Sequence, residues 1–179
     1  MNKNRVFLLL FIVILIVFIV LLISYKDDSK IMNYVRLVNP SEKLEIESIF
    51  PITDYAGKLT DKSKDKKNIY YNFKIKNYSK KNSVYKILLK VTKHENSVDD
   101  KYVKILLSDD KDQILSKYDK DSFLTLDYLE KENGYYVLHK SSLGDGKEDS
   151  YTLRLWISDK YKDEDLDKVF DSEIIIYSY

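Results

Sequence analysis

The amino-acid sequence predicts an all-β fold, an antiparallel β-sandwich of Ig-like size that is preceded by one transmembrane α-helix. Three observations support this prediction. An unbroken apolar run occupies residues 6–23. The main apolar segments after residue 43 alternate with polar residues at a period of two, which is typical of half-buried strands. The chain also has 16 tyrosines but only four glycines, and tyrosine favours sheet surfaces.

The apolar run at 6–23 contains 18 residues without a charge, a glycine or a proline. At a rise of 1.5 Å per residue it extends about 27 Å, close to the hydrocarbon thickness of a bilayer. We therefore expect residues 6–24 to form a transmembrane helix. A cleaved signal peptide is the alternative, but its apolar region is usually about 7–15 residues long and ends at small residues. Here Ile23 and Tyr25 would occupy the small-residue positions.

The residues on either side of the run predict its orientation. Lys3 and Arg5 precede it, whereas Lys26 is followed at once by two aspartates. The positive-inside rule places residues 1–5 in the cytoplasm and the rest of the chain outside. We expect a single-pass protein of the cell membrane, with a polar stalk at 25–43 and an extracellular β-sandwich domain at 44–179.

Six segments of the predicted outer domain follow the period-two pattern of strands. They lie at 44–50, 69–76, 85–92, 103–107, 151–158 and 174–179. Two further segments are ambiguous. Residues 123–129 fit either a strand or an irregular crossing, and residues 163–170 fit one or two helical turns.

Turn-forming residues separate these segments. Residues 77–83 join two strong strand patterns and predict a hairpin connection. Gly144 and Gly146 supply positive-φ positions before the segment at 151–158. The lysine-rich stretch 58–67 predicts a solvated loop. Antiparallel strands with one polar face and short turns favour a β-sandwich.

Composition excludes several classes of function. The chain has no cysteine, so disulfides and thiolate metal sites are impossible. Without Lys3 and Arg5 it carries 28 basic and 29 acidic residues. This balance gives no basic excess of the kind that nucleic-acid binding requires, so we expect no nucleic-acid partner.

No motif predicts a catalytic, cofactor-binding or metal-ligating residue. The segment that starts with His94 and Glu95 resembles the beginning of a zinc-protease motif, but Val98 stands where the second histidine would be. We expect His94 to be a structural residue at a strand end. Acidic clusters at 109–112, 145–149 and 159–167 are typical of solvated loops. A nucleophile elbow, a P-loop and a dinucleotide fingerprint are absent from the sequence, so we expect no enzyme and no cofactor.

Aromatic residues offer a second kind of candidate. Some could be exposed and bind a polymer or a partner. The alternative is that alternate members belong to the core and the others form pairs on the sheet surface. The residues concerned are Tyr70, Tyr71, Tyr135, Tyr136, Trp156, Tyr177 and Tyr179. Trp156 alternates with Leu155 and Ile157, and this two-sided apolar strand favours a central position in its sheet.

Four sequence pieces recur in the same order in a known group of proteins. They are Phe-Pro-Ile-Thr-Asp-Tyr-Ala-Gly at 50–57, a strand ending in Asn-Tyr-Ser at 71–79, Tyr-Lys-Ile-Leu-Leu at 85–89, and Tyr-Thr-Leu-Arg-Leu-Trp-Ile at 151–157 followed by an acidic segment, Phe170 and a last strand at 174–177. In these pieces the chain resembles the TasA/camelysin family of small exported Gram-positive surface and biofilm-matrix proteins. The resemblance implies an Ig-like or jelly-roll β-sandwich, export, and a role at the cell surface or in extracellular fibres.

The expected function is therefore that of a membrane-anchored cell-surface protein with a structural or interaction role in the cell envelope or matrix. Its predicted partners are the membrane, through residues 6–23, and a protein or a second copy of the chain, through a sheet edge. The last strand, at 173–179, is the candidate edge. A pilin-like subunit and, less favoured, a surface hydrolase built on carboxylates are the alternatives.

Overall fold

The computed structural model describes Leu15 and residues 34–39, 43–46, 51–59, 69–115, 123–162 and 168–179. The chain divides into two compact units, Met1–Met32 and Asn33–Tyr179. Apart from Leu15, the predicted head and transmembrane helix at 1–24 lie outside the described residues. In the part of the chain that is described, no helix is both long enough and apolar enough to cross a membrane.

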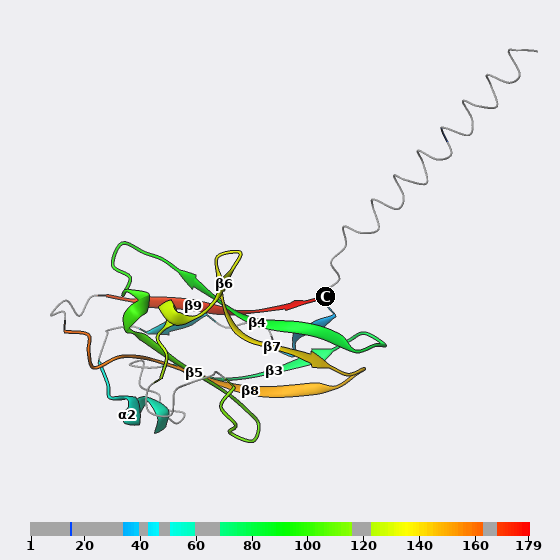
Figure 1. Ribbon diagram of the computed structural model, residues 1–179, viewed down its shortest axis with the longest axis horizontal. Helices are drawn as coiled ribbons and strands as arrows, with labels where there is room; N and C mark the ends of the chain where they lie inside the picture. Colours follow the sequence, from blue (N-terminus) through cyan, green and yellow to red (C-terminus); the bar gives the residue numbers. More distant parts are fainter. Residues whose placement is uncertain are drawn as a thin grey trace, which may run out of the picture. The chain divides into compact units, whose positions relative to one another are not determined.

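The described part of the second unit consists mainly of two antiparallel sheets (Figure 1), which confirms the prediction of an all-β sandwich. The first, sheet A, has the strand order β1-β3-β8-β5. Its strands are β1 (Val35–Leu37), β3 (Ile69–Asn77), β8 (Glu148–Ile157) and β5 (Val103–Asp109).

The second, sheet B, has the strand order β2-β9-β4-β7-β6. Its strands are β2 (Leu44–Ile46), β9 (Phe170–Ser178), β4 (Ser83–Thr92), β7 (Tyr135–Leu143) and β6 (Lys131–Glu132). Short helices complete the described elements: α2 (Asp54–Leu59), η1 (Asp100–Tyr102) and η2 (Leu126–Tyr128).

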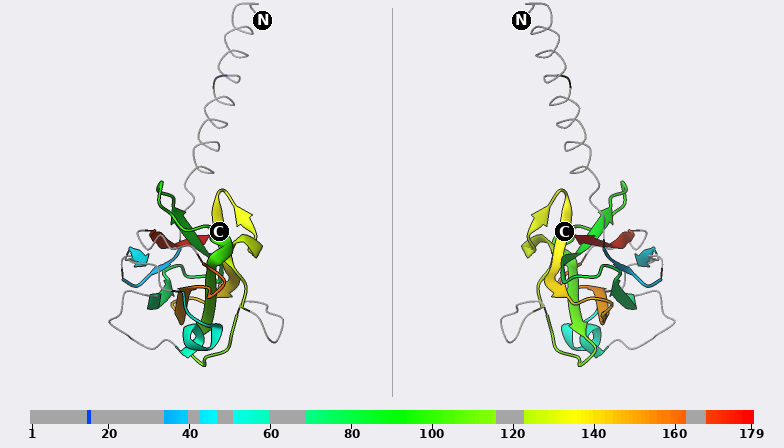
Figure 2. Two further views of the ribbon diagram at one scale, coloured as in Figure 1. Left: turned by 90° about the vertical axis from the view of Figure 1, so that its left-hand side faces the viewer. Right: turned by 90° about the vertical axis from the view of Figure 1, so that its right-hand side faces the viewer.

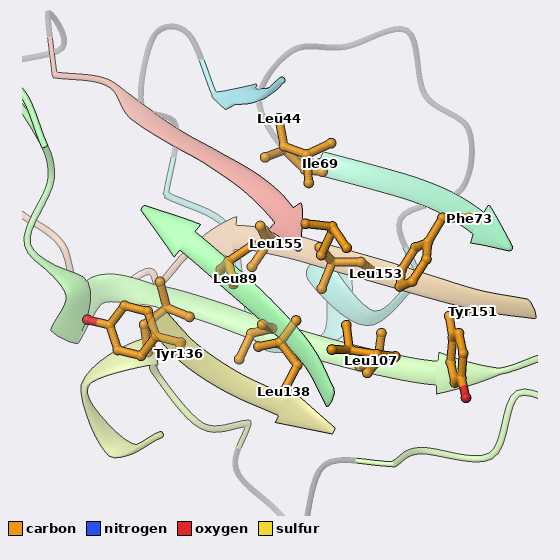
Figure 3. Close-up of a cluster of buried hydrophobic side chains, with 14 of the residues drawn as sticks. Leu44, Ile69, Phe73, Leu89, Leu107, Tyr136, Leu138, Tyr151, Leu153 and Leu155 are labelled. Atoms are coloured by element: carbon orange, nitrogen blue, oxygen red, sulfur yellow. The ribbon is translucent and has the colours of Figure 1, made fainter. Parts of the chain in front are cut away.

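The hydrophobic core lies between the two sheets. Alternate residues of each strand point into it, as the period-two pattern predicts. Figure 3 shows Phe73, Leu153 and Leu155 of sheet A in one cluster with Leu89 and Leu138 of sheet B, and all five side chains are buried. Each fully buried side chain of this size stabilises the fold by about 1.5–3 kcal/mol, which supplies the main driving force in a domain without disulfides.

Trp156 forms a second, smaller core on the other face of sheet A. It lies on β8 between β3 and β5, so the predicted central position of this strand is confirmed. Its side chain is fully buried. Helix α2, on the outer side of sheet A (Figure 2), covers the indole ring so closely that a Cβ added at Gly57 would lie 2.3 Å from it. Phe123 packs edge-on against the same ring, with centroids 5.3 Å apart.

The β domain begins before residue 44. Strand β1, which falls inside the predicted stalk at 25–43, pairs with β3 along Leu37↔Ile75 and Val35↔Asn77. Val35 is completely buried, and its backbone N–H donates a hydrogen bond to Ser178 Oγ at 3.1 Å. Three residues are too few to display a period of two, so the sequence pattern does not reveal this strand.

The predicted hairpin at 77–83 is wrong. Strands β3 and β4 belong to different sheets, and the chain crosses from sheet A to sheet B between them. Asn77 organises the crossing, because its buried Nδ2 donates to the carbonyl oxygens of Lys81 at 2.7 Å and Leu143 at 2.8 Å. Its Oδ1 accepts from the backbone N–H of Ser79 at 2.9 Å. The side chain thereby ties together two connections between the sheets, the one after β3 and the one after β7.

The C-terminal strand is not the edge element that the sequence analysis proposes. β9 lies between β2 and β4 in sheet B. Its residues Ile174 and Ile176 are part of the core. A deletion of this strand would therefore unfold the domain, and loss of self-association in such a variant would say nothing about a binding edge.

The two ambiguous segments are irregular where they are described. Residue Thr125 bridges Lys104 of β5, and the 3₁₀ helix η2 follows it. In the second segment Val169 bridges Ser97 and Phe170 opens β9, so this end of the predicted helical turn is extended. Residues 163–167 lie outside the described part.

Candidate functional site

A polar groove crosses the outer face of sheet A and is the first of two adjoining hollows. Its volume is about 390 Å³. This outer groove is lined by Asn39, Tyr70, Tyr71, Asn72, Phe73, Lys74, Asp110, Ser150, Tyr151 and Thr152. The register of β3 and β8 builds it, because Asn72 lies opposite Thr152 and Lys74 opposite Ser150. Alternation directs these residues outward while their neighbours enter the core.

The side chains along the outer groove are already ordered by contacts with each other. Thr152 Oγ1 donates to Asn72 Oδ1 at 2.8 Å, and Asn72 Nδ2 lies 3.5 Å from Tyr70 Oη. The guanidinium carbon of Arg154 lies 5.0 Å from the centroid of the Tyr70 ring. A cation over an aromatic face at this distance contributes about 0.5–1 kcal/mol at an exposed site, so the contact favours this orientation of the ring.

The second hollow opens between the sheets at the β5 and β7 side. It has a volume of about 290 Å³. This lateral pocket is lined by Asp109, Asp110, Lys111, Leu115, His139, Ser141, Asp149, Ser150 and Tyr151. It shares Asp110, Ser150 and Tyr151 with the outer groove, so the two hollows adjoin at the end of β5. The acidic clusters at 109–112 and 145–149, far apart in sequence, meet here.

A hydrogen-bonded group of two tyrosines and an aspartate adjoins the lateral pocket, which two of its members, Asp149 and Tyr151, line. Tyr85 comes from sheet B, whereas Tyr151 and Asp149 come from β8 of sheet A. The two phenol oxygens contact each other and lie 3.2 and 3.4 Å from Asp149 Oδ2. Two O–H groups thus serve two acceptors, the carboxylate and the other phenol. The group links the sheets through polar bonds inside the core.

Burial controls the protonation of this group. It raises the pKa of Tyr85 and, together with the hydrogen bond that Tyr151 donates to Tyr85, that of Tyr151. Burial also lowers the pKa of His139, although the charge of Asp149 acts in the opposite direction. Both phenols and the imidazole are therefore neutral near pH 7, and Asp149 is the acceptor around which the phenols are arranged.

The structural role expected for His94 can be compared with its surroundings. Among the described residues, no group of three or more His, Asp or Glu side chains is placed to hold a metal ion. His94 instead lies just after β4, with Nε2 2.6 Å from Asp171 Oδ2. Lys43 Nζ lies 3.0 Å from the same oxygen. This cluster joins the ends of β2, β4 and β9.

The Asp171 cluster predicts a loss of stability in acid. Burial acts to raise the pKa of Asp171, but hydrogen bonds from His94 and Lys43 outweigh it and lower the pKa below its usual 3.8. The ionised form therefore stabilises the fold above about pH 4, and this contribution is lost as the pH falls through the lowered pKa. We expect Asp171→Asn to cost about 1–3 kcal/mol at pH 7 and to flatten the acid limb of the stability–pH curve.

Urea denaturation between pH 2.5 and 7 measures this effect. Asp159→Asn, an exposed aspartate in the turn after β8, is the control and should keep the wild-type pH profile. An unchanged acid limb in Asp171→Asn would contradict the assignment.

The aromatic candidates divide between core and surface. Trp156 and Tyr136 are buried, Tyr70, Tyr71, Tyr135 and Tyr177 are half-buried, and Tyr179 is exposed. On the outer face of sheet B the ammonium of Lys86 lies 5.3 Å from the Tyr179 ring and binds Glu132. Of these seven candidates, Tyr70 and Tyr71 are among the residues that line the outer groove.

Sequence reasoning missed both hollows. The polar residues of the outer groove are mainly outward members of β3 and β8, two strands that the period-two pattern predicts. In the lateral pocket, His139 and Ser141 lie on β7, which none of the six predicted segments covers. Which outward residues combine into a site can be predicted only when the neighbouring strand is known. Here β3 pairs with β8 across about 80 positions of sequence. The one local signal is that Asn72, Ser150 and Thr152 are small hydrogen-bonding residues at outward positions of strands whose other outward residues are aromatic or charged.

Comparison with known proteins identifies no similar protein. No protein-family model matches the chain, and neither a curated protein nor a solved structure shows significant similarity to it.

Proposed function

We propose that the chain is a membrane-anchored, non-enzymatic protein of the cell surface whose β-sandwich domain binds a component of the cell envelope or matrix. In this proposal residues 6–24 cross the membrane, residues 1–5 face the cytoplasm, and the Ig-like or jelly-roll domain lies outside. The observation that carries the binding role is the outer groove, a hollow of about 390 Å³ with a preformed set of hydrogen-bonding side chains.

The chemistry of the two hollows favours binding over catalysis. Acid–base or nucleophilic catalysis needs a nucleophile within hydrogen-bond reach of a base. In the described part of the lateral pocket, Asp149 is engaged by two neutral phenols rather than by a histidine. In the outer groove, Asn72, Thr152 and Tyr70 bond to each other, and none of these groups is a base at neutral pH.

The apolar run supports the location. An insertion of 18 apolar residues next to a basic head is favourable in a bilayer, and the two aspartates that follow it do not reverse the orientation. A surface position would place the groove in contact with polymers of the envelope.

Protease treatment of intact cells tests this function. The full chain carries an epitope tag after Tyr179, an exposed residue. We expect the chain in the membrane fraction and loss of the tag when protease is added outside. The matched variant, with residues 6–23 deleted, should leave the membrane fraction. A tag that stays protected in intact cells, or a wild-type chain in the soluble fraction, would overturn the proposed location.

The binding role is tested by cross-linking on the cell surface. A non-enzymatic binding protein should be recovered with envelope material, and groove substitutions should reduce the recovery. If the recovered species contains only further copies of this chain, the role is structural self-association through a sheet edge, and the binding proposal fails.

A further inference from the structure

We propose that the outer groove binds a neutral polyhydroxylated chain, a polysaccharide, along the outer face of β3 and β8. This inference deepens the proposed function and rests on it. The site consists of the phenol ring of Tyr70, the amides of Asn39 and Asn72, and the hydroxyls of Ser150 and Thr152, with Lys74 and Asp110 among its lining residues.

The donor and acceptor groups of the groove match vicinal hydroxyls. A sugar hydroxyl both donates and accepts, and an amide offers both functions on one planar group. The two amides and two hydroxyls of the groove can therefore bond to neighbouring hydroxyls in pairs. The face of the Tyr70 ring opposite Arg154 adds an apolar surface on which the C–H face of a sugar ring can lie, with the phenol hydroxyl at the edge.

The charges of the groove argue for a neutral ligand. Lys74 and Asp110 contribute one charge of each sign, so the lining as a whole carries no net charge. A phosphate polymer or a nucleic acid would meet the Asp110 carboxylate and would need a basic excess. A peptide strand would need a free sheet edge or apolar side-chain pockets, whereas this groove lies on a sheet face and crosses paired strands.

The groove is preorganised. Its side chains stand on two paired strands, and Thr152, Asn72, Tyr70 and Arg154 are linked by the contacts already described. Binding then immobilises few side chains, which otherwise costs about 0.5–1.5 kcal/mol each. The volume of about 390 Å³ falls in the range of about 300–1,000 Å³ that small-molecule sites occupy.

Binding of the full chain to immobilised oligosaccharides tests the inference. The protein is kept in polyoxyethylene detergent micelles, because detergents with sugar headgroups would compete. The probes are neutral oligosaccharides of glucose, galactose, mannose and N-acetylglucosamine, together with polyanionic heparin and a random peptide set. We expect saturable binding to at least one neutral series, tighter for hexamers than for dimers.

Substitutions in the groove identify the site. Asn72→Ala and Thr152→Ala each remove a ligand hydrogen bond and should weaken binding by about tenfold. Tyr70→Ala should weaken it further than Tyr70→Phe, which keeps the ring. Tyr55→Ala removes an equally large tyrosine that is 75% exposed on α2 and should bind like the wild type. Each variant's denaturation midpoint is measured first, and Lys74→Ala, at an exposed position, provides a groove variant with little effect on folding.

Each outcome decides for or against the inference. Neutral-glycan binding that falls with the groove variants and not with Tyr55→Ala supports it. No binding to a neutral series, binding only to heparin or peptides, or binding that the groove variants leave unchanged would overturn it. A negative result with the oligosaccharides would not change the result expected from the protease and cross-linking experiments. Failure of the polysaccharide inference and failure of the proposed surface function are therefore distinguishable.

Discussion

Replacing Asn77 by alanine is expected to lower the free energy of unfolding by about 2–4 kcal/mol. The buried amide supplies hydrogen bonds to the carbonyls of Lys81 and Leu143 and accepts one from Ser79. Removing it takes a donor from the Leu143 carbonyl and an acceptor from the Ser79 N–H, whereas the Lys81 carbonyl keeps its bond from Ser79 Oγ. Each buried group left unsatisfied costs about 1–3 kcal/mol. Urea denaturation followed by far-UV circular dichroism measures the change.

Two further variants test whether the loss comes from the hydrogen bonds of Asn77 or from any substitution in the segment that joins β3 to β4. Asn82→Ala removes an exposed asparagine from the same connection and should change stability by less than about 0.5 kcal/mol. Asn77→Asp keeps the shape but places a carboxylate oxygen, an acceptor, where Nδ2 donates to the carbonyl oxygens, so it should be at least as damaging as alanine. An Asn77→Ala protein as stable as the wild type would show that the side-chain bonds do not hold the two connections together.

Trp156→Ala is expected to destabilise the domain by about 3–5 kcal/mol. The indole is fully buried between β8, α2 and Phe123, and its removal leaves a cavity that the short helix cannot fill by moving inward. The loss should also release α2, because the helix has six residues and depends on this contact. Hydrogen exchange of the α2 amides and chemical denaturation measure the two effects.

The phenylalanine variant distinguishes volume from polarity. Within the described residues the indole N–H of Trp156 has no hydrogen-bond partner, so Trp156→Phe loses apolar contact but no hydrogen bond. It should cost clearly less than alanine. A loss as large as that of Trp156→Ala would indicate a polar role of the indole. Since the chain has only one tryptophan, its fluorescence in the wild type reports directly on this contact.

The sequence alone was enough to locate most of the strands and their inward faces. In β3, β4 and β8 the alternation is long and regular, and burial of one face is what the alternation encodes. The two-sided strand around Trp156 also predicted its central place correctly. Local pattern and global structure agree in these elements because each strand separates a polar and an apolar face on its own.

Strand pairing could not be read from the same pattern. The segment after Asn77 has the composition of a hairpin turn, yet the chain changes sheets there, because the asparagine side chain binds the distant connection at Leu143. A true hairpin was overlooked at Asn133 and Gly134, both at positive φ, which join β6 to β7. Asn-Gly is the usual signal of such a turn, but the two-residue strand before it has no recognisable alternation.

The candidate site depends on strand pairing and therefore could not be predicted from the sequence. Asn72 and Thr152 meet only because β3 lies next to β8, and Asp110 joins them only because β5 flanks β8 on the other side. Each of these residues has an ordinary surface identity in the sequence. Their combination is a property of three strands that come from distant parts of the chain.

The position of β9 determines when the domain can fold. β2 and β4, made early, both pair with a strand that begins at Phe170, and the backbone of Val35 binds Ser178 across 143 positions. Sheet B therefore cannot close until nearly the whole domain has been synthesised, and contacts of such high sequence separation form slowly. Until then β4 has an unpaired edge on that side, which is a site for aggregation. In the topology proposed above, with residues 1–5 in the cytoplasm and the domain outside, this order of assembly would keep the domain unfolded during export and postpone its folding to the far side of the membrane.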